Sequence, residues 1–215
     1  MKKVMASLAA TFVLVGGAYA EGETPNDGSG FYIGAGFGIS GYYATFFDNS
    51  YNMDDPDNTY VVSASKLNDN DAGYLLYAGY QINKIIGVEF SYTDYGRFEY
   101  KKYHQEPKAV AVYANAGYTF LNGQLRPFGN LGLGYLKQNQ SDRYYDLKDK
   151  FATVHFGIGG EYYPTVLKGL GFRAAMEGDV YVDRVTAVDE DTNKRSTESL
   201  WQEYYLFYAG VQYKF

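Results

Sequence analysis

The chain has 215 residues, a formal net charge of −6, no cysteine, 25 tyrosines and 25 glycines. The acidic balance argues against binding to nucleic acid, so we expect no nucleic-acid partner. The lack of cysteine excludes a disulfide framework and a thiolate metal site.

The first 20 residues have the features of a secretory signal peptide. Two lysines are followed by a short apolar run and by the small-residue cleavage site Ala-Tyr-Ala. The apolar run is too short for a membrane-spanning helix. We therefore predict a signal peptide at residues 1–20 and a polar periplasmic segment at residues 21–30.

The residues that follow contain eight segments in which apolar and polar side chains alternate. This period of two predicts β-strands with one apolar face. Strands of about ten residues suit a tilted membrane crossing, and only helices and closed barrels satisfy every backbone group in lipid. The predicted strands are residues 31–41, 72–81, 86–95, 109–120, 125–136, 152–163, 170–182 and 203–215.

The connections between these segments alternate between long and short. The short ones are residues 82–85, 121–124 and 164–169. Short periplasmic turns and long extracellular loops are typical of outer-membrane barrels. The pattern predicts an all-β domain at residues 31–215, an eight-stranded antiparallel transmembrane β-barrel with up-and-down meander topology. The long connections are residues 42–71, 96–108, 137–151 and 183–202.

Three stretches of the sequence, FYIGAGFG, RPFGNLGLGY and the C-terminal AGVQYKF, carry a family resemblance. The chain resembles the OmpA-like and opacity-type eight-stranded outer-membrane proteins. This resemblance implies a place in the cell outer membrane, in contact with lipid and lipopolysaccharide. It also implies recognition of Gly210, Tyr213 and Phe215 by the barrel-assembly machinery. Because no peptidoglycan-binding domain follows Phe215, we do not expect anchoring to the cell wall.

The alternation places several charged side chains on the inner face of the predicted barrel. Buried charges there must be paired. The turn at residues 164–169 places Glu161 roughly opposite Arg173, and Arg126 begins the neighbouring strand. We therefore predict a cluster with Glu161 between Arg126 and Arg173, and with Glu89 and Glu177 as further partners. Such a cluster is either a structural plug or a gate whose pairs exchange partners and let small ions pass.

The sequence gives little indication of catalysis or metal binding. Some eight-stranded relatives are lipid A deacylases that need a Ser two residues after a His, whereas here His155 is followed at that position by Gly157. We therefore expect no enzyme and no cofactor. The carboxylates of Asp54, Asp55 and Asp57 suit Ca²⁺, but their spacing matches no EF-hand, which favours a solvated acidic loop.

The long loops hold most of the charge and several aromatic residues. Tyr144, Tyr145 and Trp201 either contact partners or pack on neighbouring loops and lipid headgroups. We expect a surface protein with a structural role, whose loops interact with host or environmental ligands in an adhesin-like way. The alternative is a small porin-like ion channel with a gated, charge-paired lumen.

Overall fold

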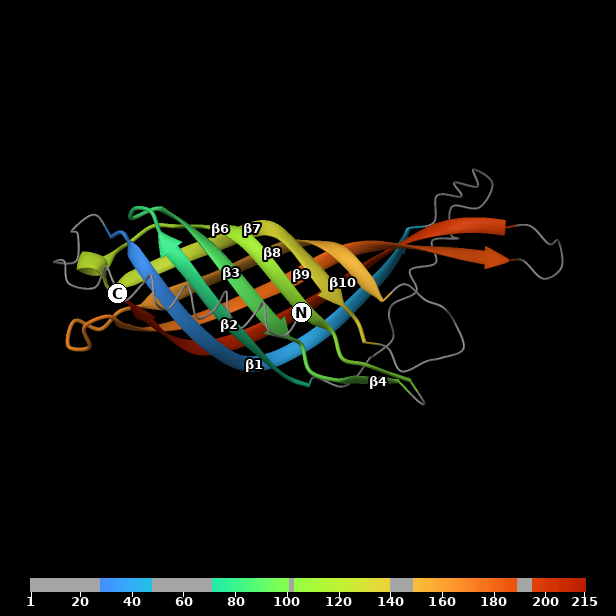
Figure 1. The fold of residues 1–215 in the computed structure, drawn as a ribbon, viewed down its shortest axis with the longest axis horizontal. Coiled ribbons are helices and arrows are strands. Elements are labelled where there is room, and N and C mark those ends of the chain that lie inside the picture. The colour runs from blue at the N-terminus through green and yellow to red at the C-terminus, as the bar shows by residue number, and fades with distance from the viewer. Residues whose placement is uncertain (1–27, 48–70, 101–102, 140–148, 189–194) are drawn as a thin grey trace, which may run out of the picture.

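In the computed structural model, residues 28–47, 71–100, 103–139, 149–188 and 195–215 are described. The main strands close into one barrel in the order β1-β10-β9-β8-β7-β6-β3-β2, and all neighbours are antiparallel. The predicted eight-stranded meander is therefore confirmed (Figure 1). The barrel strands are β1 (Gly30–Phe47), β2 (Ala72–Gln81), β3 (Ile86–Asp94), β6 (Lys108–Gly117), β7 (Leu125–Lys137), β8 (Lys150–Tyr162), β9 (Leu170–Val188) and β10 (Arg195–Lys214).

The alternating sequence pattern becomes an alternation of burial along each strand. In β3, Val88 and Phe90 are exposed on the outer wall, whereas Glu89 and Ser91 are buried in the lumen. Successive side chains of a strand point to opposite faces, so the polar set fills the inside. The barrel is therefore apolar outside and polar inside, the reverse of a water-soluble domain.

Several strands extend beyond their predicted ends. β1 continues to Phe47, β9 continues to Val188, and β10 already begins at Arg195. Pairing of β9 with β10 runs out to Val188 and Arg195, so their backbone groups bond to each other instead of forming an irregular loop. Figure 1 shows these two strands projecting past the rest of the barrel wall.

The two ends of the barrel differ. At one end lie short connections, among them the 3₁₀ helix η1 (Leu121–Gly123), together with the C-terminus (Figure 1). We call this the turn end. The opposite end, which we call the loop end, carries the projecting β9 and β10 and a small hairpin of β4 (Phe98–Tyr100) and β5 (Tyr103–Gln105).

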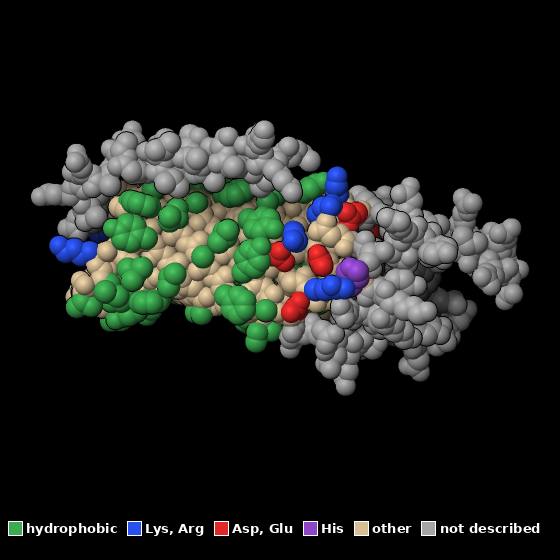
Figure 2. All heavy atoms as spheres, turned by 60° about the horizontal axis from the view of Figure 1, so that its bottom comes forward, with side chains coloured by type: hydrophobic (Ala, Val, Ile, Leu, Met, Phe, Trp, Pro, Cys, Tyr) green, Lys and Arg blue, Asp and Glu red, His purple; other side chains and the backbone are tan. Residues whose placement is uncertain are grey.

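On the face of the barrel shown in Figure 2, hydrophobic side chains are spread along the wall, and most of the charged side chains gather toward one end. Leu131 and Leu133 are 65% and 73% exposed, which would be unfavourable over such an area in water. An outward apolar band is what a transmembrane barrel presents to lipid. Among the described residues, no helix is long and apolar enough to cross a membrane.

Candidate functional site

Arg173, on β9, lies at the centre of the lumen and is buried. Its Nη1 atom is 2.9 Å from Glu89 Oε2, and its Nη2 atom is 2.9 Å from Glu177 Oε1. The guanidinium carbon also lies 4.4 Å from the ring centroid of Tyr77 and 4.3 Å from that of Phe128. Charge-assisted hydrogen bonds and cation–π contacts together compensate the desolvation of this cation.

Tyrosine hydroxyls bind the two carboxylates that pair with Arg173. Glu89 accepts hydrogen bonds from Tyr32, at 2.6 Å, and from Tyr113. Glu177 accepts one from Tyr208 at 2.8 Å. The cluster is therefore a network in which each buried carboxylate has a cation and at least one neutral donor, which makes the burial of both charges tolerable.

His155 points into the lumen, as predicted, and is fully buried on β8. Its Nδ1 atom is 3.4 Å from Asp179 Oδ1, and its Nε2 atom is 3.6 Å from Glu177 Oε2. Its ring stacks on Tyr113 with centroids 4.4 Å apart. Asp179 in turn accepts a 2.6 Å hydrogen bond from Tyr95, so the network continues toward the loop end.

Buried aromatic and amide side chains close the lumen beyond Asp179. The rings of Tyr181 and Tyr204 lie parallel within 12°, with centroids 6.3 Å apart. The Tyr181 hydroxyl donates to Gln202 at 2.6 Å, and Gln138 donates to the Tyr204 hydroxyl at 3.2 Å. This layer, which we call the tyrosine lid, separates the charge network from the loop end.

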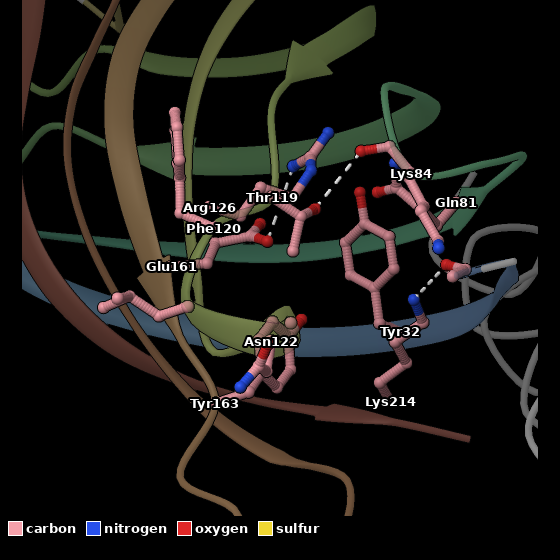
Figure 3. A pocket seen from close by; sticks show the side chains of 13 residues that line it. Tyr32, Gln81, Lys84, Thr119, Phe120, Asn122, Arg126, Glu161, Tyr163 and Lys214 are labelled. Atoms are coloured by element: carbon pink, nitrogen blue, oxygen red, sulfur yellow. Dashed lines mark hydrogen bonds and ion pairs between the residues drawn. The ribbon is translucent and has the colours of Figure 1, made fainter. Parts of the chain in front are cut away.

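A cavity of about 630 Å³ opens at the turn end of the lumen (Figure 3). At its wall, Arg126 Nη1 lies 3.4 Å from Glu161 Oε2, and Arg126 Nη2 donates to the Ile85 carbonyl at 3.1 Å. Burial raises the pKa of the Tyr163 hydroxyl, which therefore stays neutral. Charged and polar residues that line this cavity include Tyr32, Lys84, Arg126, Glu161, Tyr163 and Lys214.

All five residues of the predicted charge cluster are buried, but their ion pairs form two separate groups instead of one cluster. Arg126 and Glu161 face each other from register-paired positions of β7 and β8. The expected contact of Glu161 with Arg173 is wrong, although these residues are also register partners. Arg173 instead reaches Glu89 on β3, a partner that does not lie on a neighbouring strand. The sequence analysis did not predict that tyrosine hydroxyls bind the two carboxylates. The alternation pattern could have indicated it, because it places these tyrosines on the same inner face as the charged residues.

The C-terminal residues singled out in the sequence lie at the seam between β1 and β10. Gly210 pairs with Gly36, and the Phe215 backbone amide donates to the Phe31 carbonyl at 2.9 Å. The rings of Tyr213 and Phe215 contact each other edge to face, with centroids 5.1 Å apart. Recognition of this strand by the assembly machinery stays a prediction.

The predicted loop contacts fall mostly outside the described part of the chain. Trp201 lies on β10 and is 46% exposed. Tyr144 and Tyr145 lie outside the described residues, as do Asp54, Asp55 and Asp57 of the first loop.

A closed eight-stranded wall, an apolar outer band and a polar lumen define an outer-membrane β-barrel. The model of the outer membrane protein beta-barrel domain family matches residues 6–215, and the chain belongs to this family. The protein is therefore located in the cell outer membrane. A comparison with curated proteins gave no match.

Solved structures of outer-membrane proteins are similar to this chain at low sequence identity. Ail, the attachment invasion locus protein of Yersinia pestis, is 18% identical over 86% of this chain and 99% of its own, with a TM-score of 0.44. Neisserial surface protein A is 17% identical over 87% and 98%, with a TM-score of 0.47. The outer membrane protein AlkL is 12% identical over 90% and 95%, with a TM-score of 0.51.

The family also orients the molecule. Outer-membrane barrels place their short turns in the periplasm and their long loops outside the cell. The turn end, with the charged cavity, therefore faces the periplasm, and the loop end faces the exterior.

Proposed function

We propose that this protein is a surface-exposed structural and interaction protein, whose loop end binds host or environmental partners in an adhesin-like way. The observation that carries the proposal is the length of β10, which has 20 residues. A tilted membrane-crossing strand needs only about 9–11 residues. About half of β10, paired with β9, therefore projects outside the cell as an ordered ribbon.

The closed lumen supports a structural role for the barrel. The Arg173 network fills its centre, and the tyrosine lid lies between that network and the exterior. An eight-stranded barrel is only wide enough for its side chains to fill. In this proposal the barrel serves as a rigid anchor in lipid and lipopolysaccharide, and the projecting ribbon presents the interacting surface.

A shortened ribbon tests this proposal. Thr186 and Thr197 are register partners, so replacing residues 186–197 with Asn-Gly closes the hairpin nearer the membrane. We expect bacteria that carry the shortened protein to lose attachment to cultured host cells, measured against bacteria with the intact protein at equal surface level. As the control, a change of the exposed periplasmic Lys168 to Ala leaves attachment intact. Equal attachment by the shortened protein would contradict the proposal.

A small ion-conducting pore is the second candidate function. It is favoured by the charged periplasmic cavity and by the long 3.4 Å separation of Arg126 from Glu161, a pair that a small shift would open. Single-channel recordings of refolded protein in a planar bilayer test it, with Arg126→Ala and Arg173→Ala alongside. Discrete steps that change size in the variants support a pore, whereas silence from folded protein favours the plug.

We infer that the protein carries no catalytic role. The one histidine on a barrel-spanning strand, His155, is enclosed between Asp179, Glu177 and Tyr113 and is away from lipid. Incubation of the refolded protein with lipopolysaccharide, followed by mass spectrometry of lipid A, tests this inference. Loss of an acyl chain would contradict it.

We also propose that the barrel-assembly machinery recognises the last strand through Gly210, Tyr213 and Phe215. Replacing Phe215 by Ala removes the terminal ring that packs on Tyr213. We expect a lower level of protein in the outer membrane of cells but unchanged refolding into detergent. A parallel loss of refolding in detergent would show that the ring acts in folding alone.

A further inference from the structure

The periplasmic cavity concentrates positive charge, although the whole chain has a net charge of −6. Lys84, Arg126 and Lys214 line it, and Glu161 is the one carboxylate among the described residues of its lining. Lys214 Nζ donates to the Gly28 carbonyl at the rim, which fixes one cation there (Figure 3). Among the described residues of its lining, three cations therefore stand beside one carboxylate.

Arg126 is buried at the wall of this cavity with incomplete hydrogen bonding. The residue is only 5% exposed, and its Nε atom has no hydrogen-bond partner among the described residues. Its Nη1 contact with Glu161 is 3.4 Å, longer than a normal hydrogen bond of this kind. A guanidinium carries five donors, and a buried donor without a partner costs free energy. Arg126 therefore has unused capacity for an anionic acceptor.

We propose that this cavity is a binding site for a phosphate group. Arg126 is the main ligand, and the ammonium groups of Lys84 and Lys214 are further cations that attract the phosphate. The cations among the described lining residues favour an anion, and the planar donors of arginine, one of which has no partner, suit phosphate oxygens. A volume of about 630 Å³ admits a phosphate with an attached headgroup or small organic group. The phosphate comes either from lipid headgroups of the inner leaflet or from soluble compounds of the periplasm.

Titration of the refolded protein in an uncharged, phosphate-free detergent tests the site. One arm of the experiment adds inorganic phosphate. The other arm adds short-chain phosphatidylglycerol, and a short-chain diacylglycerol without phosphate is its control. The readout is the amide NMR shifts of residues 119–123, which line the cavity. We expect saturable shifts. Saturation by both probes identifies a site open to soluble phosphate, and saturation by the lipid alone identifies a headgroup site.

Paired lysine variants separate a defined site from general surface charge. Lys84 and Lys168 are both exposed at the periplasmic end, but only Lys84 lines the cavity. We expect Lys84→Ala to weaken phosphate binding roughly two- to fivefold, the size expected for a solvent-accessible charge pair. Lys168→Ala, the matched control, leaves binding unchanged. Equal weakening by both variants would overturn the proposal.

Two variants test the role of Arg126 itself. Glu161→Gln removes the carboxylate that competes for the guanidinium, so we expect tighter phosphate binding. Arg126→Lys keeps a cation beside Glu161 but lacks the planar donors, so we expect a folded barrel with weaker binding. The dispersion of the NMR spectrum verifies folding in each case. No saturable shift with either phosphate source in the unmodified protein would refute the site.

Discussion

Arg173 shows how a single residue can hold a polar lumen together. Its two ion pairs of 2.9 Å reach from β9 to Glu89 on β3 and to Glu177 on its own strand. Tyrosine hydroxyls bind both carboxylates, so neither negative charge depends on the arginine alone. Arg173 therefore ties opposite walls of the barrel together, and the free energy of the cluster depends on all of its members.

Replacing Arg173 by Met leaves Glu89 and Glu177 buried without their cation. We expect a loss of about 3–5 kcal/mol in the free energy of unfolding, because breaking a buried ion pair leaves uncompensated charge. Urea unfolding in detergent micelles, followed by tryptophan fluorescence of Trp201, measures it.

A triple variant separates the loss of a partner from the loss of packing. Adding Glu89→Gln and Glu177→Gln to Arg173→Met removes the stranded charges, so most of the lost stability should return. If the triple variant stays as unstable as the single one, packing of Arg173 on Tyr77 and Phe128 is the larger contribution.

The sequence predicted the members of the charge cluster better than their partners. Arg126 and Glu161 lie on adjacent strands joined by register, so alternation and turn position were enough to bring them together. The contact of Arg173 with Glu89 crosses the lumen between strands that are not neighbours. Such a contact depends on barrel diameter and on rotamers of long side chains, which the pattern along single strands does not contain.

At the level of the strands, β1 depends on glycine where it pairs with β10. Gly38 is paired with Tyr208, and a Cβ atom at Gly38 would collide with the backbone carbonyl of Phe207. Gly160 on β8 differs, because a Cβ atom there would meet no atom within 4 Å. The glycines of this barrel are therefore not equivalent, although the sequence shows both only as members of alternating strands.

The contrast between these glycines gives the second prediction. Gly38→Ala forces the β1–β10 seam apart, and we expect it to destabilise the barrel by about 1–3 kcal/mol, as overpacking does. Gly160→Ala is the matched control and should change the stability by less than about 0.5 kcal/mol. Urea midpoints in micelles compare the two variants. Similar midpoints for both would show that the seam relaxes around the added methyl group.

The strand ends were the least predictable part of the fold. Residues 183–202 are rich in charged and polar side chains and were predicted to be a loop, yet β9 and β10 pair through most of this stretch. The predicted strand length of about ten residues came from the thickness of the membrane. It applies only to the part of a strand that lies in lipid. Outside lipid, no membrane thickness limits the length of a strand, and the register of β9 with β10 continues there.

The whole molecule is organised by depth in the membrane. Exposed apolar side chains cover the middle of the barrel wall, and ion pairs such as Lys108–Asp94, at 3.0 Å, lie at the loop end of their strands. Strand number and the alternation of long and short connections were predicted by counting the alternating segments and the stretches between them. The outward apolar face was predicted because lipid contacts the outer wall of any transmembrane barrel. The depth of each residue in the membrane could not be predicted in this way, because it depends on the register between all neighbouring strands.

Arginine substitutions along β7 measure this depth. Leu131 lies at the middle of the strand and Leu125 at its periplasmic start, and both point outward. Arginine on the lipid face costs about 2–4 kcal/mol at the membrane midplane and about 0–1 kcal/mol near the interface. We therefore expect Leu131→Arg to be far more destabilising than Leu125→Arg in phospholipid vesicles, measured by guanidinium unfolding. In detergent micelles the difference should shrink, because a micelle deforms around the charge more readily than a bilayer. Equal costs in vesicles would mean that the barrel lies at a different depth, with Leu131 near the interface.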